Sequence, residues 1–80
     1  MIIICSMNIQ TLLGRNIRLA REKKGWSQDQ LSAESGLHRT YISGVERGVR
    51  NPTIAIVQQI AVSLNVEINE LFINRDTPKE

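Results

Sequence analysis

Two short helical segments joined through a single glycine constrain this chain more than any other feature. The first segment covers residues 28–35 and ends before Gly36, and the second runs from about residue 38 to residue 47 and ends at Gly48. Four apolar side chains recur in this stretch at fixed offsets: Leu31, Leu37, Ile42 and Val45. Gly36 supplies a turn in which a side chain would be costly. The pattern predicts two helices that pack against each other across a sharp corner.

A longer helix is expected before this corner. Its apolar positions have helical spacing and are Ile9, Leu12, Leu13, Ile17 and Ala20. Gly25 follows Lys24 as a stop signal, and Ser27 then has the character of an N-cap, with Gln30 three residues on as in a capping box. The first helix therefore ends shortly before the second begins.

Two further helices are expected after the corner. Pro52 marks a loop, Thr53 can cap a fourth helix that Asn65 closes, and a last short helix covers residues 67–73. No stretch alternates with a period of two for long enough to form a strand. We predict an all-α fold, a compact domain of five helices with the sharp corner between helices two and three.

Eighty residues allow one small domain. We expect residues 1–8 to be an N-terminal extension, 9–73 the folded domain and 74–80 a polar tail. The single cysteine, Cys5, has no partner for a disulfide or at zinc-ligand spacing, so both kinds of scaffold are excluded and no cofactor is expected. The apolar start, from Met1 to Cys5, is too short for a signal peptide or a membrane span, so we expect no membrane partner and a cytoplasmic location.

The net charge of +2 conceals an uneven distribution of charge. Residues 1–50 carry eight basic and four acidic side chains, a balance of +4, whereas residues 51–80 carry two basic and four acidic ones, a balance of −2. Such asymmetry suggests a polyanionic partner on the basic side, although a solvated charged surface would have the same composition.

The corner fits a helix-turn-helix template, and residues 9–73 resemble the phage repressor and Cro-type family, also called the xenobiotic-response-element type. The resemblance rests on Gly14-x-x-Ile17-Arg18-x-x-Arg21, Gly25-Trp26-Ser27-Gln28-x-x-Leu31 and Tyr41-Ile42-Ser43-x-x-Glu46-x-Gly48. The segment 39–44, with Glu46-Arg47 and Arg50-Asn51 after it, is most similar to the controller proteins of restriction–modification systems. The resemblance implies a lambda-repressor-like fold that binds double-stranded DNA.

In such a fold the third helix enters the major groove while the second crosses the DNA backbone. The polar residues Arg39, Thr40 and Ser43 lie off the apolar face of this helix, and we expect them to contact bases. Arg39 can form two hydrogen bonds to the O6 and N7 atoms of guanine. By resemblance to the controller proteins, Arg50 reaches a base as well.

Phosphate contacts are expected at the ends of the same helices. Ser27 and Gln28 stand where free backbone N–H groups and the helix dipole favour an anion. Ser27 is equally well explained as a plain N-cap, and the resemblance implies that Gln28 clamps a phosphate and braces the recognition helix. Tyr41 either bonds a phosphate or packs its ring, and we assign Asn51 and His38, at the edge of the groove, to the phosphate contacts.

Two matched positions have a different role. The resemblance implies that Arg21 and Glu46 form an internal ion pair between the first and third helices, so we expect them to stabilise the fold rather than to contact DNA.

A single helix-turn-helix reads too few base pairs for specificity, and the family binds near-palindromic sites as twofold dimers. The last helix carries more apolar residues than one-sided packing needs, so it is a candidate dimer interface. The candidate interface residues are Asn65, Val66, Ile68, Leu71, Phe72 and Ile73. Simple packing of this helix on the fourth is the alternative.

We therefore predict a dimeric, sequence-specific DNA-binding transcriptional regulator, the controller protein of a restriction–modification system acting on its own promoter. A general phage-type repressor and an antitoxin-like protein with a toxin partner are the alternatives. An activator would also contact RNA polymerase. We do not expect an enzyme, because the sequence has no paired-carboxylate site, no nucleophile with a base and no phosphate-binding glycine loop.

Overall fold

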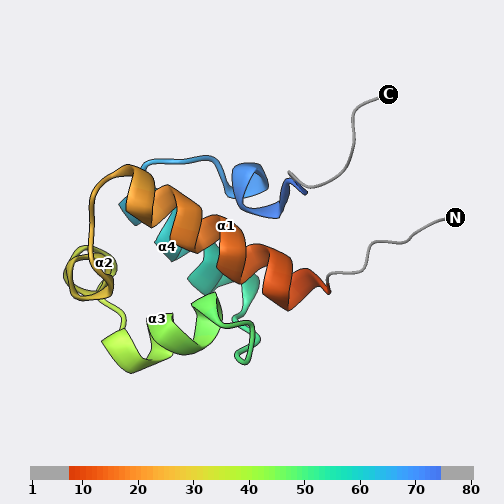
Figure 1. Ribbon diagram of the computed structural model, residues 1–80, viewed down its shortest axis with the longest axis horizontal. Helices are drawn as coiled ribbons and strands as arrows, with labels where there is room; N and C mark the ends of the chain where they lie inside the picture. Colours follow the sequence, from red (N-terminus) through yellow and green to blue (C-terminus); the bar gives the residue numbers. More distant parts are fainter. Residues whose placement is uncertain (1–7, 75–80) are drawn as a thin grey trace, which may run out of the picture.

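The computed structural model of this protein describes residues 8–74. They form α1 (Ile9–Lys23), α2 (Gln28–Ser35), α3 (Arg39–Glu46), α4 (Ile54–Leu64) and the 3₁₀-helix η1 (Ile68–Phe72). Figure 1 shows α1 crossing the middle of the molecule, with α3 on one side of it and η1 on the other. The expectations for the apolar start of the chain and for the tail beyond residue 74 concern residues outside the described range.

Local capping explains where the helices begin and end. The side chains of Asn8, Ser27 and Thr53 each accept a hydrogen bond from the backbone N–H three residues further on, at the start of α1, α2 and α4. Gly36 (φ 78°) and Asn65 (φ 59°) end α2 and α4 in the left-handed conformation. The roles of Ser27, Gly36, Thr53 and Asn65 were expected from the sequence, whereas Asn8 was assigned to the N-terminal extension and is the N-cap of α1.

The prediction of five α-helices is wrong at the C-terminal end. The structure has four α-helices among the described residues, and the last element is a 3₁₀-helix of 5 residues. Glu67 and Glu70 form a reciprocal capping box around its start, and Ile73 is already extended. So short a segment offers room for few i to i−4 bonds, and the tighter 3₁₀ turn is a common form for such short pieces.

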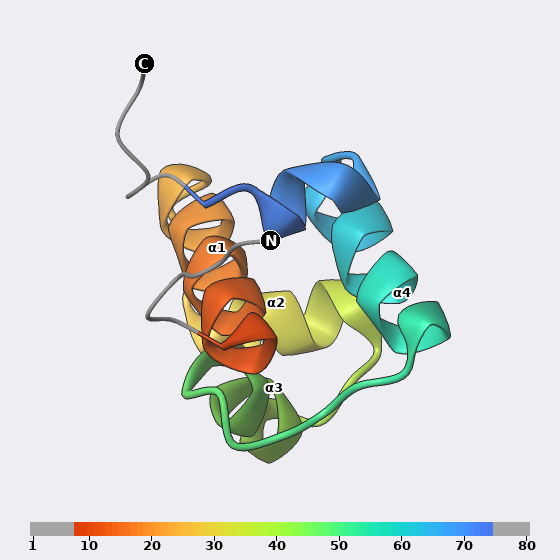
Figure 2. The same cartoon turned by 90° about the vertical axis from the view of Figure 1, so that its right-hand side faces the viewer.

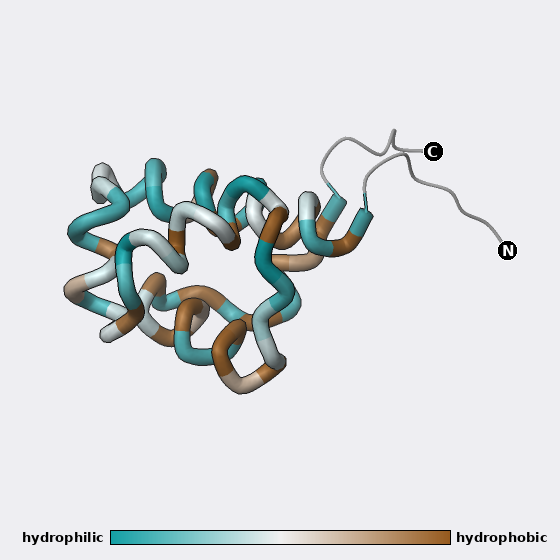
Figure 3. Tube along the Cα trace, turned by 90° about the horizontal axis from the view of Figure 1, so that it is seen from below, coloured by the Kyte–Doolittle hydropathy of each residue, from teal (hydrophilic) through white to brown (hydrophobic). Residues whose placement is uncertain are grey.

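All five elements contribute to one apolar core. Its fully buried members are Ile17 from α1, Leu31 from α2, Ile42 and Val45 from α3, Ile60 and Leu64 from α4, and Leu71 from η1. Figure 2 shows α2 between α3 and α4, both of which it contacts. Figure 3 shows hydrophobic and hydrophilic residues interspersed along the Cα trace.

Two residues of α1 set the positions of its neighbours. A Cβ atom at Gly14 would lie 2.2 Å from the carbonyl oxygen of Val45 and 2.6 Å from that of Glu46, so the backbones of α1 and α3 touch directly. The amide nitrogen of the buried Asn16 donates to the carbonyl oxygens of Leu71 (2.9 Å) and Ile73 (2.8 Å). The central helix thus holds α3 on one side and the C-terminal segment on the other.

Within the described range, no helix is long and apolar enough to cross a membrane.

Candidate nucleic-acid interface

Side-chain hydrogen bonds hold the corner between α2 and α3. The Ser32 hydroxyl donates to the carbonyl oxygen of Leu37 (2.5 Å), and the Leu37 N–H donates to the Ser35 hydroxyl (3.2 Å). From α4, the Gln59 amide donates to the carbonyl oxygen of Ser35 (2.7 Å). Together with the left-handed Gly36, these bonds satisfy polar groups of the turn and fix the angle between the two helices.

Ser32 and Ser35 both take part in the hydrogen bonds of the turn. Ser35 is buried, and both its hydroxyl and its carbonyl oxygen accept hydrogen bonds in the turn. Serine is short enough to bond its own neighbourhood, which suits it to such turns.

The outer face of α3 carries the residues predicted to contact bases. Arg39 and Thr40 are exposed and Ser43 is half-buried, whereas Ile42 and Val45 on the inner face are buried. His38 is the N-cap residue of α3, and its exposed side chain makes no capping bond. Figures 1 and 2 both show α3 at the edge of the molecule. The helix therefore presents a polar surface of its own to solvent.

The side chain of Arg50 packs against α3, although Arg50 itself belongs to the loop that follows this helix. Its guanidinium is 5.7 Å from the centre of the Tyr41 ring. A Cβ atom at Gly44 would be 2.7 Å from Cγ of Arg50, so the missing side chain of this glycine is what lets Arg50 lie across α3. The Gln10 amide on α1 holds the carbonyl oxygen of Arg50 at 3.1 Å. The Tyr41 ring is half-buried between Arg50 and the core, and Asn51 is exposed beside it.

Arg21 and Glu46 form a two-pronged ion pair inside the protein. Arg21 Nε lies 2.7 Å from Glu46 Oε2, and Nη2 lies 2.9 Å from Oε1, with side chains only 11% and 3% exposed. Arg21 Nη1 also donates to the carbonyl oxygen of Trp26 (2.8 Å). The hydrogen bonds that Arg21 donates to Glu46 raise the pKa of Arg21 more than burial lowers it, so the guanidinium is charged at every ordinary pH. The pair joins α1 to the end of α3.

The side chain of Gln28 belongs to this internal network. Its amide nitrogen donates to Oε1 of Glu46 at 3.0 Å, so α2 is tied to α3 at this end too. The bracing that the resemblance implied for Gln28 is thus present, and any phosphate contact must use its remaining hydrogen or its backbone N–H. Ser27 acts as the N-cap of α2 by accepting from Gln30 N (3.0 Å).

The residues predicted for the dimer interface do not all reach the surface. Leu71 is only 1% exposed and belongs to the core of the protomer, so its assignment to the interface is corrected here. Its position in η1 points inward because the 3₁₀ turn packs on α1 and α4. The other five candidates retain exposed or half-buried surface: Asn65, Val66, Ile68, Phe72 and Ile73.

The structure adds a residue to this region that the sequence pattern did not single out. Val62 on α4 is 69% exposed. It lines a hollow of about 290 Å³ together with Asn65, Val66 and Ile68. Val62 lies outside the apolar face of α4 that packs on the core. An apolar residue at such a position could have indicated an exposed contact surface.

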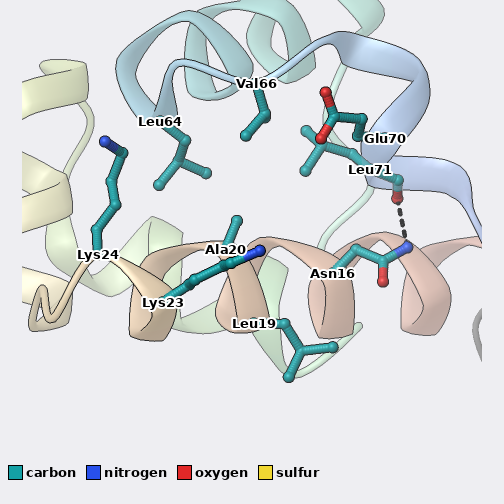
Figure 4. Close-up of a pocket in the computed structure, with 9 residues that line it drawn as sticks. All are labelled: Asn16, Leu19, Ala20, Lys23, Lys24, Leu64, Val66, Glu70 and Leu71. Atoms are coloured by element: carbon teal, nitrogen blue, oxygen red, sulfur yellow. Dashed lines mark hydrogen bonds between the residues drawn. The ribbon is translucent and has the colours of Figure 1, made fainter.

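A larger hollow of about 560 Å³ lies between α1 and the C-terminal segment. Figure 4 shows Lys23 and Asn16 on α1 facing this region, with Leu64, Val66 and Glu70 opposite and the Asn16 amide reaching the Leu71 carbonyl. Asn16 was missed by the sequence analysis, although a polar residue within the apolar face of a helix marks a candidate for a buried hydrogen bond. Among the described residues no cluster of three or more His, Cys, Asp or Glu side chains has the arrangement of a metal site.

Comparison with known proteins places this geometry in a family. The helix-turn-helix family HTH_3 matches residues 17–71. The chain is 45% identical over 62 residues to the transcriptional regulator SlrR of Bacillus subtilis, and the match covers 76% of this chain but only 41% of SlrR. It is 40% identical over 77 residues to the control protein C.SmaI of Serratia marcescens, covering 96% of this chain and 92% of that protein.

A solved structure gives the same relationship. The restriction–modification controller protein C.Esp1396I, crystallised as a tetramer with its natural 35 base-pair operator, superposes with a TM-score of 0.73. It shares 34% sequence identity, and the match covers 82% of this chain and 97% of that one. The chain described here is therefore a member of the helix-turn-helix family of transcriptional regulators and a relative of the restriction–modification controller proteins.

Proposed function

We propose that this protein binds a near-palindromic operator as a homodimer and regulates transcription from it, as the controller protein of a restriction–modification system. The observation that carries the proposal is the outer face of α3, where Arg39, Thr40 and Ser43 are joined by Arg50 from the next loop. Such a face suits the major groove, since an arginine there can read guanine through two hydrogen bonds. The protein then acts by binding and not by catalysis, in the cytoplasm where its DNA is.

The contacts divide into two kinds. Arg39, Thr40, Ser43 and Arg50 read bases, and His38, Tyr41, Asn51 and the first turn of α2 with Ser27 and Gln28 hold phosphates. Base contacts determine which sequence is bound, whereas phosphate contacts determine how the protein is placed on the duplex. The rigid corner supports this division because it holds α2 and α3 in one relative orientation.

Selection of bound sites from random duplexes, followed by titration at fixed salt, tests the proposal. Wild-type protein should enrich one half-site in two copies. Arg39→Ala should lower the preference for that site over random DNA by about five- to 150-fold, since a two-bond contact to guanine contributes about 1–3 kcal/mol of discrimination. Lys23→Ala is the matched control, because it removes an equal charge from the face of α1 opposite the Gly14 contact with α3.

Two results would count against the proposal. Selection that enriches no sequence would exclude a sequence-specific regulator. A preference left unchanged by Arg39→Ala would remove Arg39 from the base contacts. The genes beside this one distinguish a controller from a general regulator, since a controller lies next to a restriction enzyme and its methyltransferase.

The homodimer is proposed to form through a surface of α4 and η1, here called the α4–η1 surface, which is made by Val62, Asn65, Val66, Ile68, Phe72 and Ile73. Its support is a group of exposed or half-buried apolar side chains on α4 and η1, which belong to the acidic half of the sequence. Val62→Asp should shift the protein towards monomer in sedimentation equilibrium. Val49→Asp, at a valine of similar exposure (62%) in the loop after α3, should leave the association constant unchanged.

A further inference from the structure

An acidic side chain lies against the arginine proposed to read the operator. Oδ1 of Asp29, in the first turn of α2, is 3.1 Å from Nε of Arg39, the first residue of α3. Asp29 was not among the residues predicted to contact DNA. Its side chain is 79% exposed and that of Arg39 is 62% exposed, so both lie where DNA would approach.

The corner makes this pairing a property of the fold. The two residues belong to different helices, and the relative position of those helices is held by the bonds of Ser32, Ser35 and Gln59 in the turn. At the other end of α2, Gln28 is bound to Glu46 of α3. These bonds at both ends of α2 hold the backbones of Asp29 and Arg39 in one relative position.

Asp29 contacts Nε of Arg39 and so leaves the outer nitrogens of the guanidinium for DNA. Nε is the guanidinium nitrogen nearest the stem of the side chain, and the ion pair with Asp29 draws this end of the group towards the start of α2. The two outer amino groups of an arginine are suited to a pair of parallel hydrogen bonds with the O6 and N7 atoms of guanine. Holding Arg39 at Nε is thus compatible with reading a base at the same time.

We propose that Asp29 is a positioning residue for Arg39 and that it increases discrimination between the operator and other DNA. The inference rests on the proposed function. At the operator, Arg39 can keep Asp29 and gain a guanine. Where no guanine stands at that position, Arg39 can gain a phosphate instead, and reaching it costs Arg39 its partner and leaves the Asp29 carboxylate beside another negative charge.

The test compares the ratio of affinities for operator and random DNA among variants at one salt concentration. Asp29→Asn should lower this ratio by about two- to fivefold, the factor that corresponds to loss of an exposed ion pair. Glu34→Gln is the matched control, since it removes the same charge from another exposed position of α2, where Glu34 contacts Gln30 (2.9 Å) and not Arg39. A ratio is insensitive to any change in the folded fraction, because that change affects both DNAs equally.

Two further variants separate positioning from a general charge effect. In the Arg39→Ala background, Asp29→Asn should leave the ratio unchanged, because no arginine remains to be positioned. Asp29→Glu, which keeps the charge, should retain part of the discrimination.

The results that overturn the inference are distinct from those that overturn the function. If wild-type protein prefers its selected operator but Asp29→Asn behaves like Glu34→Gln, Asp29 does not position Arg39. A fall in the ratio of equal size in the Arg39→Ala background would also overturn it. If wild-type protein shows no preference for any sequence, the proposed function fails and the inference fails with it.

Discussion

The two sides of α1 are held by different kinds of contact. On the α3 side, Gly14 brings the backbones together and a buried ion pair between Arg21 and Glu46 joins the helices. On the η1 side, the uncharged amide of Asn16 bonds two carbonyl oxygens of the C-terminal segment. The first side positions the proposed recognition helix, and the second positions the segment next to the proposed dimer surface. One central helix can thus position both a DNA-binding helix and a dimer surface, because each side of the helix makes its own contacts.

The largest expected effect is on the α3 side, at Glu46. Glu46→Ala would leave the Arg21 guanidinium buried without its partner, and removal of one partner of such a pair costs about 3–5 kcal/mol. We expect a fall of that size in the free energy of unfolding, measured by urea denaturation. Glu22→Ala removes the partner of an exposed pair with Arg18 (3.4 Å) and should cost less than about 1 kcal/mol. Similar costs for the two variants would contradict the role given to burial.

The next largest effect should come from Gly14→Ala. The added Cβ would meet main-chain carbonyl oxygens of α3, which cannot move without moving the helix, so we expect a loss of about 1–3 kcal/mol. Gly44→Ala is the control, because its Cβ would meet only the flexible side chain of Arg50. Thermal unfolding should show a lower Tm for Gly14→Ala than for Gly44→Ala, whereas Gly44→Ala should weaken operator binding by displacing Arg50. Equal Tm values would mean that α1 and α3 can separate at little cost.

The smallest of the three effects is expected on the η1 side. Asn16→Ala leaves two carbonyl oxygens without their donor, one of them in a buried bond, and should destabilise the protein by about 1–2 kcal/mol. Gln10→Ala, which removes a more exposed amide bonded to the Arg50 carbonyl, should cost less. The two sides of α1 should also differ in function. Asn16→Ala should weaken self-association but leave the DNA sequence preferred in selection nearly unchanged. A changed preference with unaltered association would show that the two sides are not separate.

Much of the fold follows from short-range patterns. The caps at Ser27 and Thr53 and the turn at Gly36 are determined by residues within a few positions, and the apolar spacing marks which face of each helix is buried. The Arg21–Glu46 pair was expected from a family resemblance, because nothing local links two charges that lie 25 residues apart. The last helix was misjudged, since an apolar pattern over so few residues does not distinguish an α-helix from a 3₁₀-helix.

The remaining features depend on distances between segments far apart in the chain. Leu71 was assigned to a surface and lies in the core, because whether an apolar side chain is covered depends on the helices around it. The pairing of Asp29 with Arg39, the placement of Arg50 over Gly44 and the bonds of Asn16 likewise arise only when separate elements meet. Local interactions act through the chain and are legible in sequence order, so the chain alone determines its helices and its corner. Contacts across the fold depend on how those helices pack, so the three-dimensional arrangement decides which side chains are presented to DNA and which hold the molecule together.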